Sequence, residues 1–157
     1  MTWQIETIPF DHPEADQLRR AQRRELDARY GSDDHEPGAV PTASDVPVFI
    51  VARDPDGRAV ACGGLRPLDD AVVGPDTVEI KRMFVERTAR GSGVATAVLR
   101  ALEDAARGLG ARRVVLETGT LQPDAIRFYE REGYETIPGF GPYAGADLSV
   151  CYSRDLR

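Results

Sequence analysis

The most constraining feature of this chain is a strand-like segment that leads through two glycines into a long helical pattern. Residues 77–85 have the pattern of a β-strand, and the turn after them contains Arg90-Gly91-Ser92-Gly93-Val94-Ala95. Residues 92–109 then repeat small and apolar side chains at helical spacing, and Gly110 is placed to end the helix. Free N–H groups and the positive end of the helix dipole attract anions, and glycines let a phosphate approach the backbone. The sequence therefore predicts an anion site at the start of this helix.

Length and composition are those of a globular chain. The 157 residues are enough to bury a core and predict a single domain over residues 1–157. The formal net charge of −6 argues against a protein that coats nucleic acid. No apolar run is long enough to span a membrane, and the N-terminal residues lack the basic and apolar regions of a signal peptide. We therefore expect a cytoplasmic protein with neither a membrane nor a nucleic acid as partner.

The cysteines and histidines do not have metal-ligand spacing. Only Cys62, Cys151, His12 and His35 are available, and they lie far apart in the sequence. We therefore expect no metal, and we expect both thiols to be reduced, small core residues in strands.

Periodicity and turn residues predict the order β-α-β-β-β-α-β-α-β-β, which is a mixed α/β layer around one central sheet. Strands are expected at 3–8, 48–52, 58–65, 77–85, 113–118, 134–137 and 148–153, and helices at 13–30, 92–109 and 124–132. Gly63-Gly64 indicates a bulge or a close backbone approach, and the slip in alternation near Arg82-Met83-Phe84 indicates a bulge.

Two familiar phosphate-binding motifs do not fit the glycine turn. A P-loop needs Lys followed by Ser or Thr after the last glycine, whereas Val94-Ala95 follow here. A dinucleotide fingerprint would place glycine at Thr96 and would lie in the first βαβ unit, whereas this turn follows the fourth strand. Both motifs are excluded by particular residues.

The turn instead resembles the main motif of the GNAT superfamily of N-acetyltransferases, Gln/Arg-x-x-Gly-x-Gly/Ala, and matches it at every fixed position. The likeness extends over most of the chain from about residue 47. It is carried by Cys62-Gly63-Gly64-Leu65, Glu79-Ile80-Lys81-Arg82-Met83-Phe84-Val85, Leu116-Glu117-Thr118-Gly119 and Phe128-Tyr129-Glu130-Arg131-Glu132-Gly133-Tyr134. The first 45 residues resemble the family only in outline.

The resemblance implies the acyl-CoA N-acyltransferase fold and acetyl-coenzyme A as co-substrate. That fold has a central mixed sheet of six to seven strands, flanking helices and a splay between the fourth and fifth strands. The resemblance also implies that the diphosphate is held by the turn amides and that the pantetheine arm pairs with residues 83–85. The implied cofactor-binding residues are Met83, Phe84, Val85, Arg90, Gly91, Ser92, Gly93, Val94 and Ala95.

Direct transfer of an acetyl group to an amine needs a base for the ammonium and an acid for the departing thiolate, but no enzyme nucleophile. The resemblance suggests Glu79 as the base, acting directly or through water. The alternative is a solvated strand glutamate paired with Lys81 or Arg82. Tyr129 is the candidate acid, and its alternative role is that of a core aromatic beside Phe128.

Three further residues are candidates for contact with the acceptor. Glu117 ends the fifth strand and either orients the amine or caps the strand; His35 and Tyr143 lie in the loops at 31–46 and 138–146, which we expect to shape the acceptor pocket. The predicted function is N-acetylation of a primary amine on a small or amino-acid-like acceptor. A non-catalytic acyl-CoA sensor and a protein N-acetyltransferase remain alternatives. A homodimer is expected by resemblance only.

Overall fold

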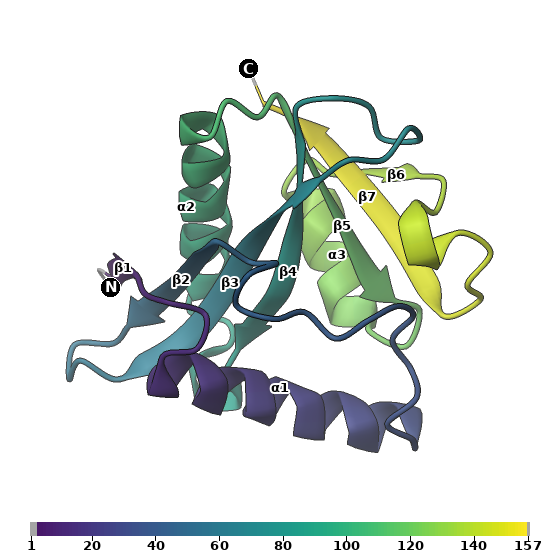
Figure 1. Cartoon of the computed structure of the whole chain (residues 1–157). Coiled ribbons are helices and arrows are strands. Elements are labelled where there is room, and N and C mark those ends of the chain that lie inside the picture. The colour runs from purple at the N-terminus through teal and green to yellow at the C-terminus, as the bar shows by residue number, and fades with distance from the viewer. Residues whose placement is uncertain (1–2, 157) are drawn as a thin grey trace.

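The chain forms one seven-stranded sheet in a computed structural model that describes residues 3–156. Met1, Thr2 and Arg157 lie outside the described residues. The N-terminal segment compared above with a signal peptide is therefore described only from Trp3 onward. The strands are β1 Gln4–Thr7, β2 Val48–Arg53, β3 Ala59–Leu68, β4 Thr77–Val85, β5 Arg113–Gly119, β6 Glu135–Ile137 and β7 Ser149–Asp155. Their order across the sheet is β1-β2-β3-β4-β5-β7-β6 (Figure 1). All neighbours are antiparallel except β4 and β5, so the sheet is mixed.

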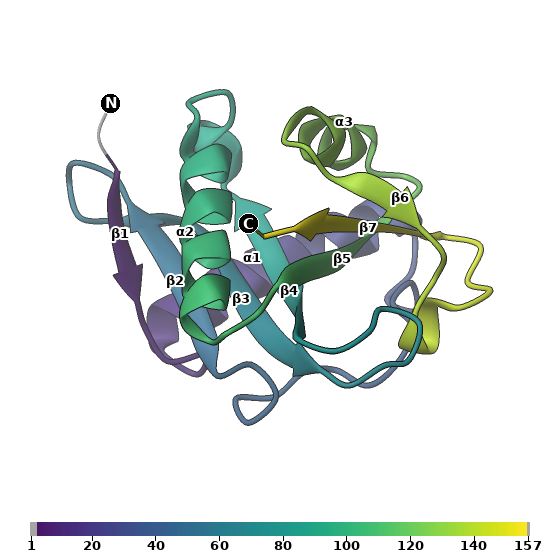
Figure 2. The same cartoon turned by 90° about the horizontal axis from the view of Figure 1, so that it is seen from above.

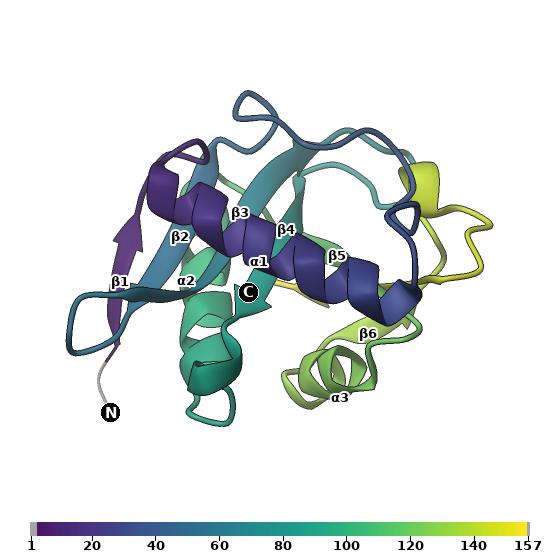
Figure 3. The ribbon, with the colours of Figure 1, turned by 90° about the horizontal axis from the view of Figure 1, so that it is seen from below.

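Helices cover both faces of this sheet. Helices α2 (Val94–Gly108) and α3 (Pro123–Arg131) lie on one face (Figure 2), and α1 (Pro13–Tyr30) crosses the other (Figure 3). The buried residues of α2 and α3 pack in one cluster with alternate residues of β2–β5, whereas α1 packs through Ala15 and Leu18 against Phe49 and Cys62. The two faces of each central strand are therefore both buried, as expected for a layered α/β fold.

Local chemistry explains where α1 starts and stops. The Nδ1 atom of His12 accepts a hydrogen bond from the N–H of Glu14 at 3.1 Å, which satisfies one unpaired donor of the first turn, and Pro13 occupies the first helical position. Gly31 ends the helix in the left-handed conformation with φ of 72°. This helix carries several residues of the site described below.

The sheet opens between β4 and β5. Their parallel pairing runs from Thr77–Arg113 to Ile80–Leu116, and no register pair follows it. Just past this point the register of β3 and β4 shifts, and Arg82 adopts φ of +59°, which is unusual for a residue with a side chain. The bulge expected near Arg82 is therefore present, and it turns the second half of β4 away from β5.

The predicted order of elements is correct, with differences of a few residues at several ends. The strand predicted to end at Leu65 continues to Leu68, because Arg66, Pro67 and Leu68 pair with the start of β4. The helix predicted from residue 92 begins at Val94. Two short 3₁₀ helices, Arg87–Ala89 and Gly141–Tyr143, lie within segments expected to be loop. Gly63 confirms the expected close approach, since a Cβ there would lie 2.7 Å from Leu102 Cδ1.

The remaining expectations concern cysteines, metals and membranes. Cys62 and Cys151 are free and buried in strands, as expected. Over residues 3–156 we find no group of three or more His, Cys, Asp or Glu side chains suited to a metal ion. Within the same range, none of the helices is both long and apolar enough to cross a membrane.

Candidate active site

The glycine turn before α2 has the geometry of an anion cradle. Gly91 and Gly93 adopt φ of 77° and 89°, and a Cβ built on either would meet nothing within 4 Å. In the described part of the chain, the N–H groups of Gly91, Ser92, Gly93 and Ala95 have no hydrogen-bond partner. Four amides at the positive end of α2 therefore face open space, which is the arrangement that binds phosphate.

Two of the six turn residues predicted to hold the diphosphate use their amides internally. The N–H of Arg90 donates to the carbonyl of Arg87 at 3.3 Å, and the N–H of Val94 donates weakly to Ser92 Oγ at 3.4 Å. The hydroxyl of Ser92 in turn donates to the carbonyl of Ala89. The amides of Arg90 and Val94 would have to exchange these internal partners to contact a diphosphate, and the role of the whole turn stays a prediction.

A groove of about 550 Å³ leads away from this turn. It runs between α1 and α3, and its lining includes Phe84, Val85, Gly93, Ala95 and Phe128. The mixed polar and apolar lining is suited to a long ligand with an anionic end.

The side chain of Arg90 is already paired inside this groove. Its Nη2 atom donates to both carboxylate oxygens of Glu25 at 2.8 and 2.9 Å, and its Nε donates to the carbonyl of Val85 at 2.9 Å. The guanidinium of Arg87 lies 3.6 Å from the same carboxylate. One carboxylate from α1 therefore pairs with both arginines nearest the anion turn and offsets one of their two positive charges.

The segment predicted to pair with a pantetheine arm has some of its backbone groups occupied. The carbonyl of Met83 accepts a hydrogen bond from Gln22 Nε2 at 2.9 Å, and the carbonyl of Val85 accepts one from Arg90. Residues 83–85 nevertheless line the groove. Pairing through these two carbonyls would need Gln22 and Arg90 to move.

A second, smaller cavity of about 100 Å³ lies in the opening between β4 and β5. Ile80 and Lys81 of β4, Leu116 and Glu117 of β5, and Tyr30 of α1 contribute to its walls. Six residues line both this cavity and the groove: Gln22, Leu26, Met83, Gln122, Ala125 and Tyr129. The two spaces therefore meet, so a ligand in the groove could present its end to a second ligand in the cavity.

Tyr129 lies at this junction. Its side chain projects from α3, is 6% exposed, and packs near Phe128, Tyr134 and Tyr152. Burial raises the pKa of the phenol above its usual value. The hydroxyl makes no hydrogen bond with the described residues, and it is therefore available to a ligand. The ring of Tyr129 is thus part of the core and the residue lines both spaces, while its role as the acid stays a prediction.

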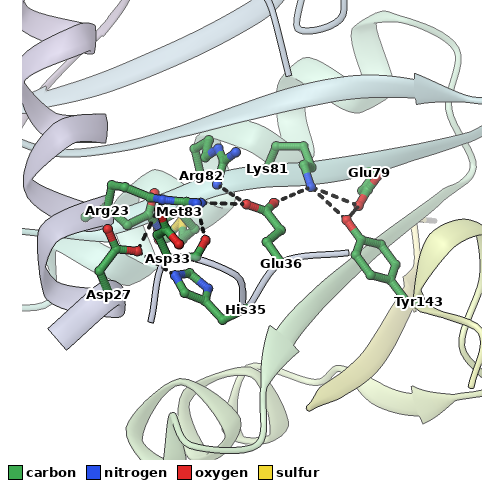
Figure 4. Close-up of polar contacts among 11 residues, drawn as sticks. Arg23, Asp27, Asp33, His35, Glu36, Glu79, Lys81, Arg82, Met83 and Tyr143 are labelled. Atoms are coloured by element: carbon green, nitrogen blue, oxygen red, sulfur yellow. Dashed lines mark hydrogen bonds and ion pairs between the residues drawn. The ribbon is translucent and has the colours of Figure 1, made fainter. Parts of the chain in front are cut away.

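Glu79 is placed differently from our expectation. Its side chain is fully buried on β4 and does not line the cavity or the groove. Its Oε2 accepts a hydrogen bond from Tyr143 Oη at 2.9 Å and lies 3.7 Å from Lys81 Nζ, while Arg66 Nε lies 3.5 Å from Oε1. The alternative of a solvated strand glutamate is wrong, because Tyr143 and Lys81 cover the carboxylate (Figure 4). The pairing with Lys81 is confirmed.

Lys81 connects Glu79 to the cavity. Its Nζ donates to Tyr143 Oη at 2.7 Å and to Glu36 Oε1 at 3.4 Å (Figure 4). The other oxygen of Glu36 accepts from Arg82 at 2.8 Å and lies 3.5 Å from Arg23. Burial alone would raise the pKa of Glu36, but the charges of Arg82 and Lys81 and their hydrogen bonds lower it. Glu36 is therefore a charged link between the 31–46 loop and β4.

Glu117 lines the cavity, as we expected of an acceptor-contacting residue. Its Oε2 accepts a hydrogen bond from Ser149 Oγ at 2.6 Å. Burial raises the pKa of this carboxyl above its ordinary value; the negative charges of Glu36 and Glu79 add to the rise, while Ser149 and Lys81 oppose it. The carboxylate does not cap its strand through any backbone N–H of the described residues.

The side chains of the two loop residues predicted to contact an acceptor, His35 and Tyr143, are both buried against other side chains of the protein. His35 Nε2 lies 2.8 Å from Asp27 Oδ1, and its ring stacks on Tyr30 with centroids 5.0 Å apart. His35 lines the cavity, so it remains a candidate contact. Tyr143 does not line the cavity; burial and the negative charge of Glu79 raise the pKa of its phenol. Its role in the structure is to cover Glu79.

The sequence alone did not point to several site residues on α1 and the loop after it. Gln22, Glu25, Leu26 and Arg29 share one face of α1 by their helical spacing, and all four line the groove. Their spacing is visible in the sequence, but nothing there says that this face meets α3 and the glycine turn. No sequence pattern marks Glu36 as a site residue, because it lies in a loop without helical or strand periodicity.

Comparisons with known proteins agree with this geometry. Residues 9–134 match the family profile described as the acetyltransferase (GNAT) family. An IAA acetyltransferase from Azospirillum brasilense is 37% identical over 108 residues, which cover 69% of this chain and 67% of that protein. The chain spans 38% to 62% of the length of several further curated N-acetyltransferases that it matches.

Solved structures give the same result for the fold. A Klebsiella pneumoniae protein provisionally classed as an acyl-CoA N-acyltransferase is 30% identical, with a TM-score of 0.81 and 99% of each chain covered. A phosphinothricin acetyltransferase from Sinorhizobium meliloti, solved with acetyl-CoA, shares the fold at 18% identity, with a TM-score of 0.66 and 99% of this chain and 89% of that chain covered.

A sheet that opens between one parallel pair, with a free helix N-terminus beside the opening, defines the acyl-CoA N-acyltransferase fold. The chain belongs to the GNAT family of acetyltransferases.

Proposed function

We propose that this protein is an acetyl-CoA-dependent N-acetyltransferase that moves an acetyl group to a primary amine on a small or amino-acid-like acceptor. The single observation that supports this most is the junction of the groove and the cavity at Tyr129. A thioester delivered along the groove would end beside a space of about 100 Å³, whose size suits a small acceptor better than a protein segment. A peptide would need a larger site.

The chain has groups suited to each part of acetyl-CoA. The free amides of Gly91, Ser92, Gly93 and Ala95 would hold the diphosphate, and residues 83–85 would lie along the pantetheine arm. Tyr129 would donate its proton to the departing thiolate, because burial keeps the phenol protonated and its hydroxyl lies where the groove meets the cavity. Direct attack by the amine requires no nucleophile from the protein, in keeping with the two buried cysteines.

Glu79 has no direct contact with the proposed acceptor space. As a base it would have to act through Lys81 and Tyr143, or through water, because those two side chains separate it from the cavity. Its more direct contribution is electrostatic: it holds Lys81 and Tyr143 in place beside the cavity wall.

The test is the release of free thiol from acetyl-CoA in the presence of small primary amines, amino acids and intact proteins. We expect thiol release with a small amine, and acetylated amine as the product by mass spectrometry. Binding of acetyl-CoA without thiol release for any acceptor would favour a sensor. Release with proteins alone would favour a protein N-acetyltransferase.

Replacement of Glu25 gives a prediction about cofactor affinity. Glu25→Gln should tighten coenzyme A binding about 2- to 5-fold, because it removes a negative charge from the groove and frees Arg87 and Arg90 for phosphates. Calorimetry at two salt concentrations measures this, and the gain should shrink at high salt. Glu14→Gln is the control, since Glu14 lies on the same helix as Glu25, pairs with Arg53 of β2 and does not line the groove. Weaker binding by Glu25→Gln would mean that Glu25 instead holds Arg90 in its binding position.

A further inference from the structure

Most charged side chains in the cavity wall have a partner of opposite charge. Glu36 is paired with Arg82 and Lys81, and Lys81 is also close to Glu79. Glu117 differs, because no basic group of the described residues lies within 4.0 Å of its carboxylate. It is thus the carboxyl group in this wall with no cation of its own.

One oxygen of the Glu117 carboxylate accepts a hydrogen bond from the protein, and the other oxygen accepts none from the described residues. Ser149 of β7 donates to Oε2 at 2.6 Å, and Oε1 has no hydrogen-bond partner among the described residues. Glu117 is half-buried, and a carboxylate that is partly removed from water without a counter-ion is unfavourable in the free protein. An ammonium group entering the cavity would supply that counter-ion, so the free protein is prepared for a cationic ligand at this point.

The two glutamates on the neighbouring strands differ in access. Glu79 is 0% exposed, is covered by Tyr143 and Lys81, and lies outside the cavity lining, whereas Glu117 is part of that lining. A proton acceptor must come within hydrogen-bond reach of the group that it deprotonates. Glu117 meets this condition for a ligand in the cavity, and Glu79 does not.

We propose that Glu117 binds the acceptor as a primary alkylammonium ion and receives the proton that this ion must lose before it can attack. This inference rests on the proposed function. It assigns the acceptor to a class, small alkyl primary amines that are cationic near neutral pH, and it moves the role of base from β4 to β5. Ser149 is the positioning residue that fixes the carboxylate.

The step balances as follows. The ammonium transfers one proton to Glu117, and the nitrogen lone pair then forms the bond to the acetyl carbon. The carbon–sulfur bond breaks, the sulfur keeps the electron pair, and Tyr129 gives it a proton. The nitrogen loses its second proton to Tyr129, and Glu117 returns its proton to water. One amide, one thiol and one proton are produced from one thioester and one ammonium ion.

The environment of Glu117 suits this role. A lysine-like amine with a pKa near 10.4 is neutral in only on the order of one molecule in a thousand at pH 7, so the enzyme must remove a proton. Burial raises the pKa of Glu117, which makes it a better base than an exposed carboxylate. The titratable or polar groups around it are Tyr30 of α1, Glu36 and His35 of the loop, Glu79, Lys81 and Arg82 of β4, Ser149 and Cys151 of β7, and Tyr129 of α3.

The test compares Glu117→Gln with the wild type on two amines of similar size. One is an alkylamine, which is charged at neutral pH, and the other is a weakly basic amine that is already neutral. We expect kcat/KM for the alkylamine to fall about 100-fold or more, and kcat/KM for the neutral amine to fall much less. An equal loss for both amines would overturn the proposal, since it would indicate a structural effect. Glu135→Gln removes an exposed carboxylate outside the site and should change neither value.

The pH profile gives a second readout. In the wild type, kcat/KM for the alkylamine should rise with pH as Glu117 ionises and then level off, whereas in Glu117→Gln it should keep rising about tenfold per pH unit with the neutral amine fraction. Retention of the wild-type profile in the variant would also overturn the proposal. Failure of the wild type to acetylate any amine would refute the proposed function itself, which is a different outcome.

A third readout does not depend on turnover. With ¹³C-labelled glutamate carboxyls, the wild type should show one resonance that titrates above the ordinary glutamate range and disappears in Glu117→Gln. Addition of an alkylammonium ion should lower the midpoint of that resonance, because a bound cation favours the carboxylate. A carboxyl whose midpoint does not respond to the cation would contradict the assigned contact. Calorimetry with coenzyme A should give the same affinity for both proteins.

Discussion

Gly93→Glu is expected to abolish coenzyme A binding. Gly93 adopts φ of 89°, and the space into which its Cβ would point is empty in the folded protein. A glutamate there would place a carboxylate among the amides that are proposed to hold the diphosphate. Like charges in a partly enclosed site repel strongly, and the side chain would also fill the cradle. Calorimetry with coenzyme A should detect no heat of binding at concentrations that saturate the wild type.

A matched control separates this effect from backbone strain. Gly110 follows α2 at its other end, has φ of 82°, and a Cβ there would also meet nothing within 4 Å. Gly110→Glu therefore carries the same added charge and the same left-handed strain, about 1–2 kcal/mol, but lies outside the groove. It should lose stability and keep its coenzyme A affinity. Normal binding by Gly93→Glu would refute the proposed diphosphate site.

The parts of the fold that could be predicted are those that depend on sequence patterns among neighbouring residues. Helical spacing in residues 94–108 and the pattern of residues 77–85 depend on near neighbours in the sequence, and each predicts the correct element. The end of β3 was not predictable, because Pro67 weakens the strand pattern and only pairing with Val78 extends it. The bulge at Arg82 was predicted from broken alternation, and the structure confirms it.

The site was less predictable because its contacts are distant in sequence. Strand alternation places Glu79 and Lys81 on the same face, but Tyr143, which covers Glu79, comes from 64 residues further along the chain. The pairing of Arg90 with Glu25 likewise joins residues 65 positions apart. Sequence motifs identify which residue types gather at the opening of the sheet. They do not tell which of two glutamates remains accessible once the loops have packed.

Tyr129→Phe should lower kcat by about 10²- to 10⁴-fold and leave coenzyme A affinity unchanged, which is the range for loss of a positioned general acid. The substitution removes no hydrogen bond within the protein, because the Tyr129 hydroxyl bonds to none of the described residues, and it keeps the packing of the ring in the core. We therefore expect the free energy of unfolding to shift by no more than about 1 kcal/mol. Single-turnover measurements of thiol release would report the chemical step directly.

For Tyr134→Phe, a substitution close to Tyr129, we expect the reverse: a loss of stability with turnover retained. The two rings are 5.7 Å apart, but the Tyr134 hydroxyl donates to the buried carboxylate of Glu103 at 2.7 Å. Its loss should cost about 1–3 kcal/mol of stability, since a hydrogen bond to a charged group is removed, although Arg100 and Arg154 still pair with Glu103. Turnover should stay near that of the wild type. If both variants lose stability and neither loses turnover in the chemical step, Tyr129 is a core aromatic and another group protonates the thiolate.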